Sequence, residues 1–499
     1  MGTVKIGWAE ESILPPNKKV SLAGQFFERI SEYVESDITA TAMAIEGDGE
    51  QAIIVSADII GLTVEGLEII REKFARLTDE VTPDKLIVGA THTHTSLRLA
   101  NPKKNAGARD TKGILKEFLP AGKEYVPLVT RDESVITDEE ALEFATDKVA
   151  RAALAAWQNR KPASFTNEFG RAVVGMCRRV SYDDGSAQMW GDTNTANFVA
   201  LEGGNDSGIE LLYTFDENKN LMGVVANIAC PAQILEQRSF ISADYWGRAR
   251  AMLREKLGEH VFLLGLCGAG GDQCPRDLVR WVEPETPIDD PNVRRPNPIK
   301  HKGDPSMYDI SGCNRAGKRI ANEIASVYEE ITELQSEGAF RHKVIHLDLP
   351  LRKATMAEYN NAVRELEHYI EKNKDKEKFD FEDNARMHVY AGTIARYRYQ
   401  QTHEVVNVEY HVLRLGNIAI VTNPFELFLD YGNRIKARSY AEQTFIIQLC
   451  CGSQGYLPTE KAEKAGHYSA YISSGWVGHE AGDLFTRENI NEINKMFAE

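Results

Sequence analysis

The segment Lys85–Ser96 constrains the fold of this 499-residue chain most, because it joins a buried strand directly to two histidines. Leu86–Val88 is a short apolar run bounded by turn residues, which predicts a buried strand. In an extended chain, side chains two residues apart point the same way, so His92 and His94 are expected to face one pocket. Open α/β sheets bind ligands at the carboxyl ends of their strands. The alternative is a pair of hydrogen-bonded histidines in a loop.

The same arrangement recurs along the chain, because at least five predicted strands end in polar, Gly-rich or Pro-rich turns. These turns lie at His92, Cys230, Cys274, Glu426 and Tyr456. Hairpins and strand–helix crossovers alternate between them, which predicts an α/β fold with mixed sheets. If all five turns lie on one rim, they form an active site.

Helical spacing predicts helices over residues 64–77, 137–159 and 311–334 and a helical pair over 355–401. The segment 241–248 is expected to lead into a further helix that ends at Leu257. A hairpin is predicted from strands 405–415 and 418–422. The charged run 371–378 inside the helical pair is expected to be a solvated tip. No internal repeat is visible.

Two segments lack a clear periodic pattern of apolar residues. Residues 97–133 are polar and are expected to form a long loop, either a lid on the pocket or a surface insertion. Residues 283–305 form a Pro-rich insertion that must be irregular, because proline breaks regular structure. Either segment could reshape the pocket for its substrate.

Bulk properties exclude several classes of protein. The net charge of −16 argues against a nucleic-acid or anionic-membrane surface, since both need clustered Lys and Arg. No apolar stretch approaches the roughly 20 residues of a membrane span, so we expect no membrane insertion. Seven cysteines in so long a chain do not form a disulfide framework, and no targeting segment is visible. These features predict a cytoplasmic protein.

Six segments together resemble the N-terminal catalytic domain of the neutral/alkaline non-lysosomal ceramidase family. They are Ala90–His94, Asn227–Cys230, Ile241–Asp244, Gly271–Pro275, Asn423–Glu426 and Gly455–Thr459. The chain is similar to a divergent, bacterial-type member. The resemblance implies one catalytic domain over residues 1–499, with mixed sheets and helices packed around them. The appended β domain of full-length ceramidases has no expected counterpart.

The resemblance also implies a catalytic Zn²⁺ site with an open position for water. Its expected ligands are His92, Glu426 and Tyr456. The family's second histidine ligand falls at Pro231, which cannot ligate. Either Cys230 or Gln233 substitutes, another metal binds, or the site is empty. Without a metal, Glu426 and Tyr456 would form an ordinary buried hydrogen-bonded pair.

Four further residues are implied at the reaction centre. Cys274 replaces the family's serine and is either a nucleophile, with a pKa lowered by His94 or Arg178, or a packed buried thiol. The resemblance gives His94 a role in supporting the reaction oxygen, and gives Arg178 and Tyr468 roles in positioning substrate. Backbone N–H groups of Gly268–Gly271 are candidates for contacting an oxyanion.

The function implied is hydrolysis of an amide or related bond by a metal-activated water. The substrate is expected to be a polar small molecule rather than a lipid. One alternative is a carbohydrate-active enzyme, acting without metal through a carboxylate pair such as Glu426 and Asp244. The other is a non-catalytic ligand-binding protein. The sequence leaves homo-oligomerisation open.

Overall fold

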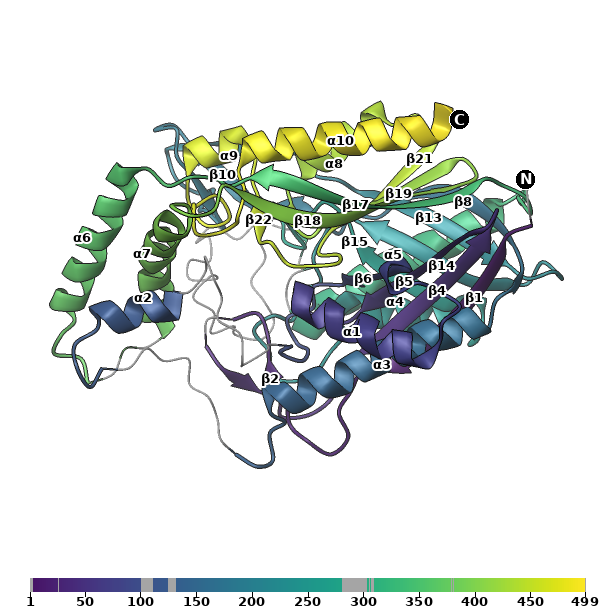
Figure 1. The fold of residues 1–499 in the computed structure, drawn as a ribbon, viewed down its shortest axis with the longest axis horizontal. Coiled ribbons are helices and arrows are strands. Elements are labelled where there is room, and N and C mark those ends of the chain that lie inside the picture. The colour runs from purple at the N-terminus through teal and green to yellow at the C-terminus, as the bar shows by residue number, and fades with distance from the viewer. Residues whose placement is uncertain are drawn as a thin grey trace.

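The computed structural model describes residues 3–498, apart from 26, 100–110, 124–131, 281–302, 305, 307–308, 378 and 380. It is a mixed α/β structure with helices packed around several mixed sheets (Figure 1), which confirms the predicted fold class. The Pro-rich insertion 283–305 falls almost wholly outside the described residues.

The first large sheet has the strand order β6-β5-β4-β1-β7. Strands β1, β4 and β5 are antiparallel neighbours, and β6 joins β5 in parallel after the crossover helix α1. A second helix, α3, packs beside α1 against the sheet, as Figure 1 shows below β4. The bounds are β1 Lys5–Ser12, β4 Thr39–Gly47, β5 Glu50–Ala57, α1 Val64–Leu77, β6 Leu86–Ala90, α3 Asp138–Gln158 and β7 Lys161–Pro162.

Two further units, each with a four-stranded sheet, repeat the topology of the β1, β4, β5 and β6 part of this five-stranded sheet, with orders β15-β14-β13-β8 and β17-β18-β19-β21. Each has two antiparallel pairings, a crossover helix and a parallel last strand. The second unit contains β8 Ser164–Arg171, β13 Gly208–Phe215, β14 Leu221–Ile228, α4 Asp244–Leu257, β15 Phe262–Cys267 and α5 Asp309–Glu330. The third contains β17 Phe340–Pro350, β18 Val405–Leu415, β19 Ile418–Thr422, α8 Leu429–Arg438, β21 Gln443–Ile447 and α10 His479–Ala498.

The threefold repeat was not visible in the sequence. Strand pairing depends on backbone hydrogen bonds and on a coarse apolar pattern, so the same topology needs no repeated residues. Sequence analysis therefore predicted most of the individual elements but missed the symmetry that relates them.

The inner faces of the three sheets share one hydrophobic core. Val55, Leu264 and Phe445 come from the three different units and are buried in the same cluster. The outer faces of the second and third sheets pack under their own helix pairs, α4 with α5 and α8 with α10. In Figure 1, α10 runs along the outer side of β17 and β18.

Local signals explain the element ends that were predicted correctly. Thr137 caps α3, and Thr137 and Glu140 form a reciprocal capping box. The β18–β19 hairpin turns at Gly416, whose φ of 56° suits glycine.

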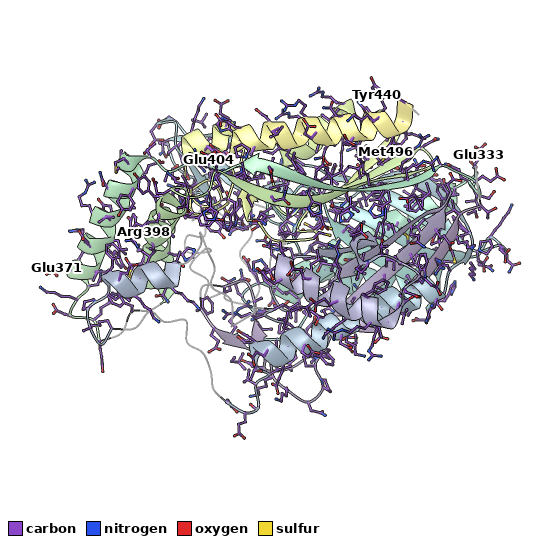
Figure 2. All side chains as sticks on the ribbon, viewed as in Figure 1. Glu333, Glu371, Arg398, Glu404, Tyr440 and Met496 are labelled. Carbon is purple, nitrogen blue, oxygen red and sulfur yellow. The ribbon has the colours of Figure 1, made fainter. Side chains whose placement is uncertain are left out.

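Helices α2, α6 and α7 stand apart from the sheets and pack on one another, at the left in Figure 1. Their bounds are Thr111–Phe118, Met356–Lys372 and Phe381–Tyr399. The prediction of an irregular loop over 97–133 is therefore wrong in part, because α2 buries Ile114 and Leu115 against α6 and α7. Figure 2 places Glu371 at the outer tip of this group, and described residues of the charged run are largely exposed, as predicted.

Short elements complete the described chain. They are β2 Ser21–Leu22, β3 Arg29–Ile30, η1 Pro83–Lys85, β9 Met176–Cys177, β10 Arg179–Tyr182, β11 Ala187–Met189, β12 Phe198–Leu201, β16 Gln273–Cys274, β20 Glu426–Leu427, β22 Tyr456–Leu457 and α9 Glu460–Ala465. No described helix has the length and apolarity needed to cross a bilayer. All seven cysteines lie in described segments, buried and without a disulfide.

Candidate active site

A cavity of about 820 Å³ opens where ends of the three units converge. Its wall includes His92, His94, Arg178, Glu426 and Tyr456. Side chains of α7 also line this cavity. Six of the seven residues singled out from the sequence, the five above and Tyr468, therefore line one space.

Each unit contributes to this wall at the carboxyl end of a strand. His92 follows β6 of the first unit. Glu426 and Tyr456 come from the third unit and are direct neighbours in the short parallel pair β20–β22. Arg178 follows β9, which pairs with β16 at the end of the second unit.

His92 does not continue the strand as predicted, because β6 ends at Ala90 and His92 has a φ of 65°. Its ring still faces the cavity beside His94, with the ring centroids 5.0 Å apart and edge to face. The shared pocket thus arises from a left-handed turn rather than from strand alternation.

The contact between His92 and Glu426 fits a bound cation. The Nδ1–H of His92 donates to the carbonyl oxygen of Ile60 at 2.5 Å, so the neutral ring has a lone pair at Nε2. Burial lowers the pKa of His92, and this favours the neutral ring despite the opposing charge of Glu426. Nε2 and Oε2 of Glu426 are therefore two acceptors facing each other across 3.7 Å. A metal ion or a proton between them would satisfy both.

Tyr456 and Arg178 complete the cluster. The Tyr456 hydroxyl bonds to Glu426 and accepts from Arg178 Nη2 at 3.3 Å. Burial, reinforced by Glu426, raises the pKa of Tyr456 well above its usual value, and a bound dication would oppose this by stabilising the phenolate. Arg178 is buried, lies 3.9 Å from Glu426 and donates to the carbonyl of Gly271 at 2.8 Å. It stays cationic, because the neighbouring Tyr456 and Glu426 outweigh burial and raise its pKa.

His94 has a separate environment. Its Nδ1 lies 3.4 Å from Oε2 of Glu236, a cavity residue that sequence analysis missed. Burial, followed by the charges of His92, Arg29 and Arg178, lowers the pKa of His94 well below normal. We therefore treat the contact as a neutral imidazole beside a carboxylate rather than as an ion pair. Glu236 follows the Cys230–Gln233 turn closely, and that spacing was the available signal.

Cys274 does not line the cavity. It is fully buried, and its thiol points to the carbonyl of Arg276 at 3.4 Å. Burial raises its pKa to about 12, although Arg178 acts in the opposite direction. This environment is that of a packed thiol and not of an activated nucleophile, so the geometry favours the packing alternative.

Of the two substitutes considered for the missing ligand at Pro231, only Gln233 faces the cavity. Its Oε1 accepts from Arg178 at 3.3 Å, and its Nε2 donates to Glu236 at 3.4 Å. Cys230 is buried outside the cavity wall. Gln233 therefore holds polar side chains in place while facing the same space.

Other expected contacts are not present. Three N–H groups of the Gly268–Gly271 turn already donate within the fold, to Ile228, Gln448 and Leu427, so the oxyanion role is not supported. Asp244 is buried outside the cavity wall and accepts from the N–H groups of Leu235 and Tyr245.

Tyr468 lines the cavity with its ring 5.5 Å from that of Tyr456. Trp190, which sequence analysis also missed, lies beside the Arg178 guanidinium at 5.9 Å. No sequence signal marks this tryptophan, because the pairing of β11 with β10 brings it to the site, and its backbone N–H donates to the carbonyl of Arg178 at 2.7 Å.

Comparisons with known proteins identify the fold. No family model matches the sequence, and a search of curated proteins finds no significant match. Neutral ceramidase from Pseudomonas aeruginosa superimposes with a TM-score of 0.66 at 14% identity, covering 98% of this chain and 74% of that one. A structure described as ceramidase complexed with C2 gives 0.65 at 12% identity, with the same coverage. The chain has the neutral ceramidase fold, as the motifs predicted.

Proposed function

We propose that the protein is a hydrolase that cleaves an amide or related bond of a polar substrate bound in this cavity. The observation that carries the proposal is the pair of facing acceptors, His92 Nε2 and Glu426 Oε2, with Tyr456 bonded to the same carboxylate. The neutral ceramidase fold of the solved relatives supports a hydrolase scaffold.

His92, Glu426 and Tyr456 would hold a divalent ion, which supplies a Lewis acid that polarises a carbonyl and activates water. Glu426 accepts a proton from the attacking water as the new C–O bond forms. Arg178 keeps Tyr456 and Glu426 in place and presents a positive charge to the substrate. Glu426 would then give the proton taken from water to the leaving amine as the C–N bond breaks. His94, a neutral imidazole beside Glu236, would donate a hydrogen bond to the carbonyl oxygen of the substrate as negative charge develops on it.

The composition of the wall supports a polar substrate. Helix α7 contributes Glu382, Arg386 and His388 to the lining of the same cavity as the cluster of ionisable groups. These additional charged groups in the lining favour hydroxyl, amine or carboxylate groups over a hydrocarbon chain. The unpaired cysteines support a reducing, cytoplasmic setting for the reaction.

The test uses the purified full chain and a panel of N-acyl derivatives of polar amines. Glu426→Gln should lower kcat/KM by at least about 100-fold, because it removes both a ligand and a base. His92→Ala should abolish both turnover and binding of the metal ion that turnover requires. Glu442→Gln changes an exposed glutamate outside the cavity and should leave activity unchanged.

The alternatives predict different results. Hydrolysis that survives chelation and His92→Ala, yet is lost in Glu426→Gln, would favour a metal-independent carboxylate mechanism. Tight ligand binding without turnover of any panel member would favour a non-catalytic binding protein.

A further inference from the structure

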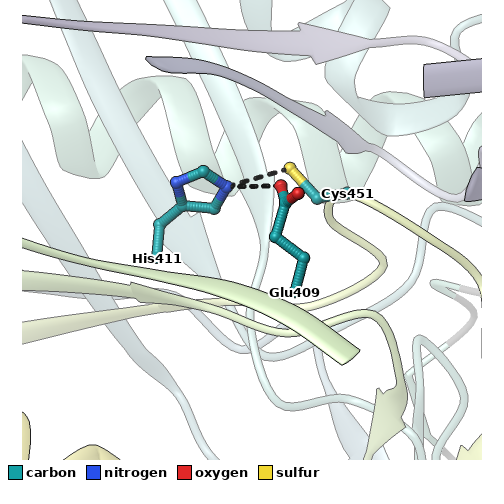
Figure 3. A group of neighbouring side chains, drawn as sticks. All are labelled: Glu409, His411 and Cys451. Atoms are coloured by element: carbon teal, nitrogen blue, oxygen red, sulfur yellow. Dashed lines mark hydrogen bonds and ion pairs between the residues drawn. The ribbon is translucent and has the colours of Figure 1, made fainter. Parts of the chain in front are cut away.

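A second group of side chains of the types that can bind metals lies outside the cavity wall, apart from His92, Glu426 and Tyr456 (Figure 3). Glu409 and His411 are on β18, and Cys451 lies shortly after β21. Nε2 of His411 is 2.9 Å from Oε1 of Glu409 and 3.5 Å from Sγ of Cys451. Across the described part of the chain, this is the one set of His, Cys, Asp and Glu residues with three ligand atoms mutually within 4.8 Å.

The spacing of these atoms suits a tetrahedral ion. With zinc bonds of about 2.0–2.1 Å to nitrogen and about 2.3 Å to sulfur, tetrahedral geometry separates the two ligand atoms by about 3.5 Å. The His411–Cys451 distance matches this value. The shorter His411–Glu409 distance needs only a small side-chain rotation to reach the corresponding value.

The position of the group in the sheet is unusual for polar side chains. Residues two apart on β18 share a face of the sheet. One face carries Glu409, His411, Leu413 and Leu415, and the other carries Val408, Tyr410 and Val412. Leu413 and Leu415 belong to the shared inner core, so Glu409 and His411 stand on the core-facing side. His411 is fully buried and Cys451 is 2% exposed. Burying these polar groups is costly unless they are satisfied.

Hydrogen bonds to His342 orient the ring of His411 so that its Nε2 faces the other two ligand atoms. The Gln51 carbonyl can only accept, so Nδ1–H of His342 donates to it at 2.8 Å. A neutral His342 then accepts at Nε2 from Nδ1–H of His411 at 2.9 Å. Nδ1–H of His411 thus donates to His342, while Nε2 lies 2.9 Å from the acceptor Oε1 of Glu409, so the proton shared by these two atoms is the one that a bound ion would displace. Such outer partners orient histidine ligands in metal sites.

The other two ligands are also held from the first unit. Arg71 on α1 forms a bidentate pair with Glu409, at 2.7 and 2.9 Å. The N–H of Cys451 donates to the carbonyl of Val88 in β6 at 2.9 Å. The group therefore lies at the junction of the first and third units, and hydrogen bonds from the first unit hold its members in position.

We propose that Glu409, His411 and Cys451 bind a divalent transition-metal ion of the zinc type, which has a structural role joining the first and third units. Thiolate and imidazole ligands select zinc-like ions over magnesium or calcium. The site is distinct from the His92, Glu426 and Tyr456 cluster, which contains no sulfur.

Cobalt(II) titration of the metal-stripped full chain tests this proposal, because a Co–thiolate bond gives a charge-transfer absorption in the near ultraviolet. In wild-type protein this absorption should rise until one equivalent of cobalt(II) per chain has bound at this site. Cys451→Ser should abolish it. Cys450→Ser is the matched control, since Cys450 is buried with its sulfur 4.0 Å from that of Cys451 but outside the ligand group. It should retain the absorption.

Two further variants keep the test decisive. Glu409→Gln should weaken cobalt binding at least about tenfold, which provides a second result if Cys451→Ser fails to fold. His92→Ala should retain the absorption, so failure of the proposed hydrolase site leaves this result unaffected. Absence of the absorption in wild-type protein, or its persistence at full strength in folded Cys451→Ser, would overturn the proposal.

Discussion

At the scale of single residues, the histidine pair depends on backbone positions that tolerate little change. Gly24 has a φ of +97°, and a methyl group added there would lie 2.4 Å from Nδ1 of His94. We expect Gly24→Ala to displace His94 and lower kcat/KM by at least about tenfold. Gly122→Ala is the matched control, because Gly122 also has a positive φ, +83°, but has open space around it. Comparable losses of activity in both variants would show that backbone strain, not the displaced ring, is responsible.

At the scale of elements, the segment after α9 holds Tyr468 through its backbone. Arg179 donates to the carbonyl of Tyr468 at 2.9 Å, and Nδ1 of His467 accepts from the N–H of Met189 at 3.1 Å. Burial, together with Arg179, lowers the pKa of His467 to about 4. Protonation would remove the acceptor and place a second charge beside Arg179.

This shift predicts a pH-dependent stability. Between pH about 6.5 and about 4 the unfolded chain binds a proton at His467 that the folded chain does not, so stability falls as pH falls through this window. We expect His467 to contribute about 2 kcal/mol to that loss, allowing for its partial exposure. Urea unfolding of wild type and His467→Asn measures it, since asparagine keeps an acceptor without titrating. Equal pH dependence in the two proteins would contradict the assignment.

At the scale of the whole molecule, three sheets of the same topology share one core, so we expect them to unfold together. Leu264 of β15 is fully buried in this core. Leu264→Ala should lower the free energy of unfolding by about 2–5 kcal/mol, through lost burial and a cavity. Far-ultraviolet circular dichroism and tryptophan fluorescence should report one coincident transition. Two separate transitions would contradict the single domain predicted over residues 1–499.

Much of the fold followed from local signals in the sequence. The capped helix from Thr137, the hairpin at Gly416 and the strand before His92 were predictable, because caps, turns and apolar periods act within a few residues. The family resemblance of the strand-end motifs was confirmed at the level of fold. Helix α2 was missed because its buried face forms only against α6 and α7.

The sequence alone determined which residues stand at the ends of strands, because alternation and turn chemistry are properties of the local chain. Only the tertiary structure decided which of those side chains face a common space. Glu426 and Tyr456 meet through β20–β22, whereas Cys274 turns into the packing. Glu409, which lies beside Cys451, pairs with Arg71 from 338 residues away in the sequence. Periodicity specifies the face on which a residue lies, but the packing of distant elements selects what that face meets.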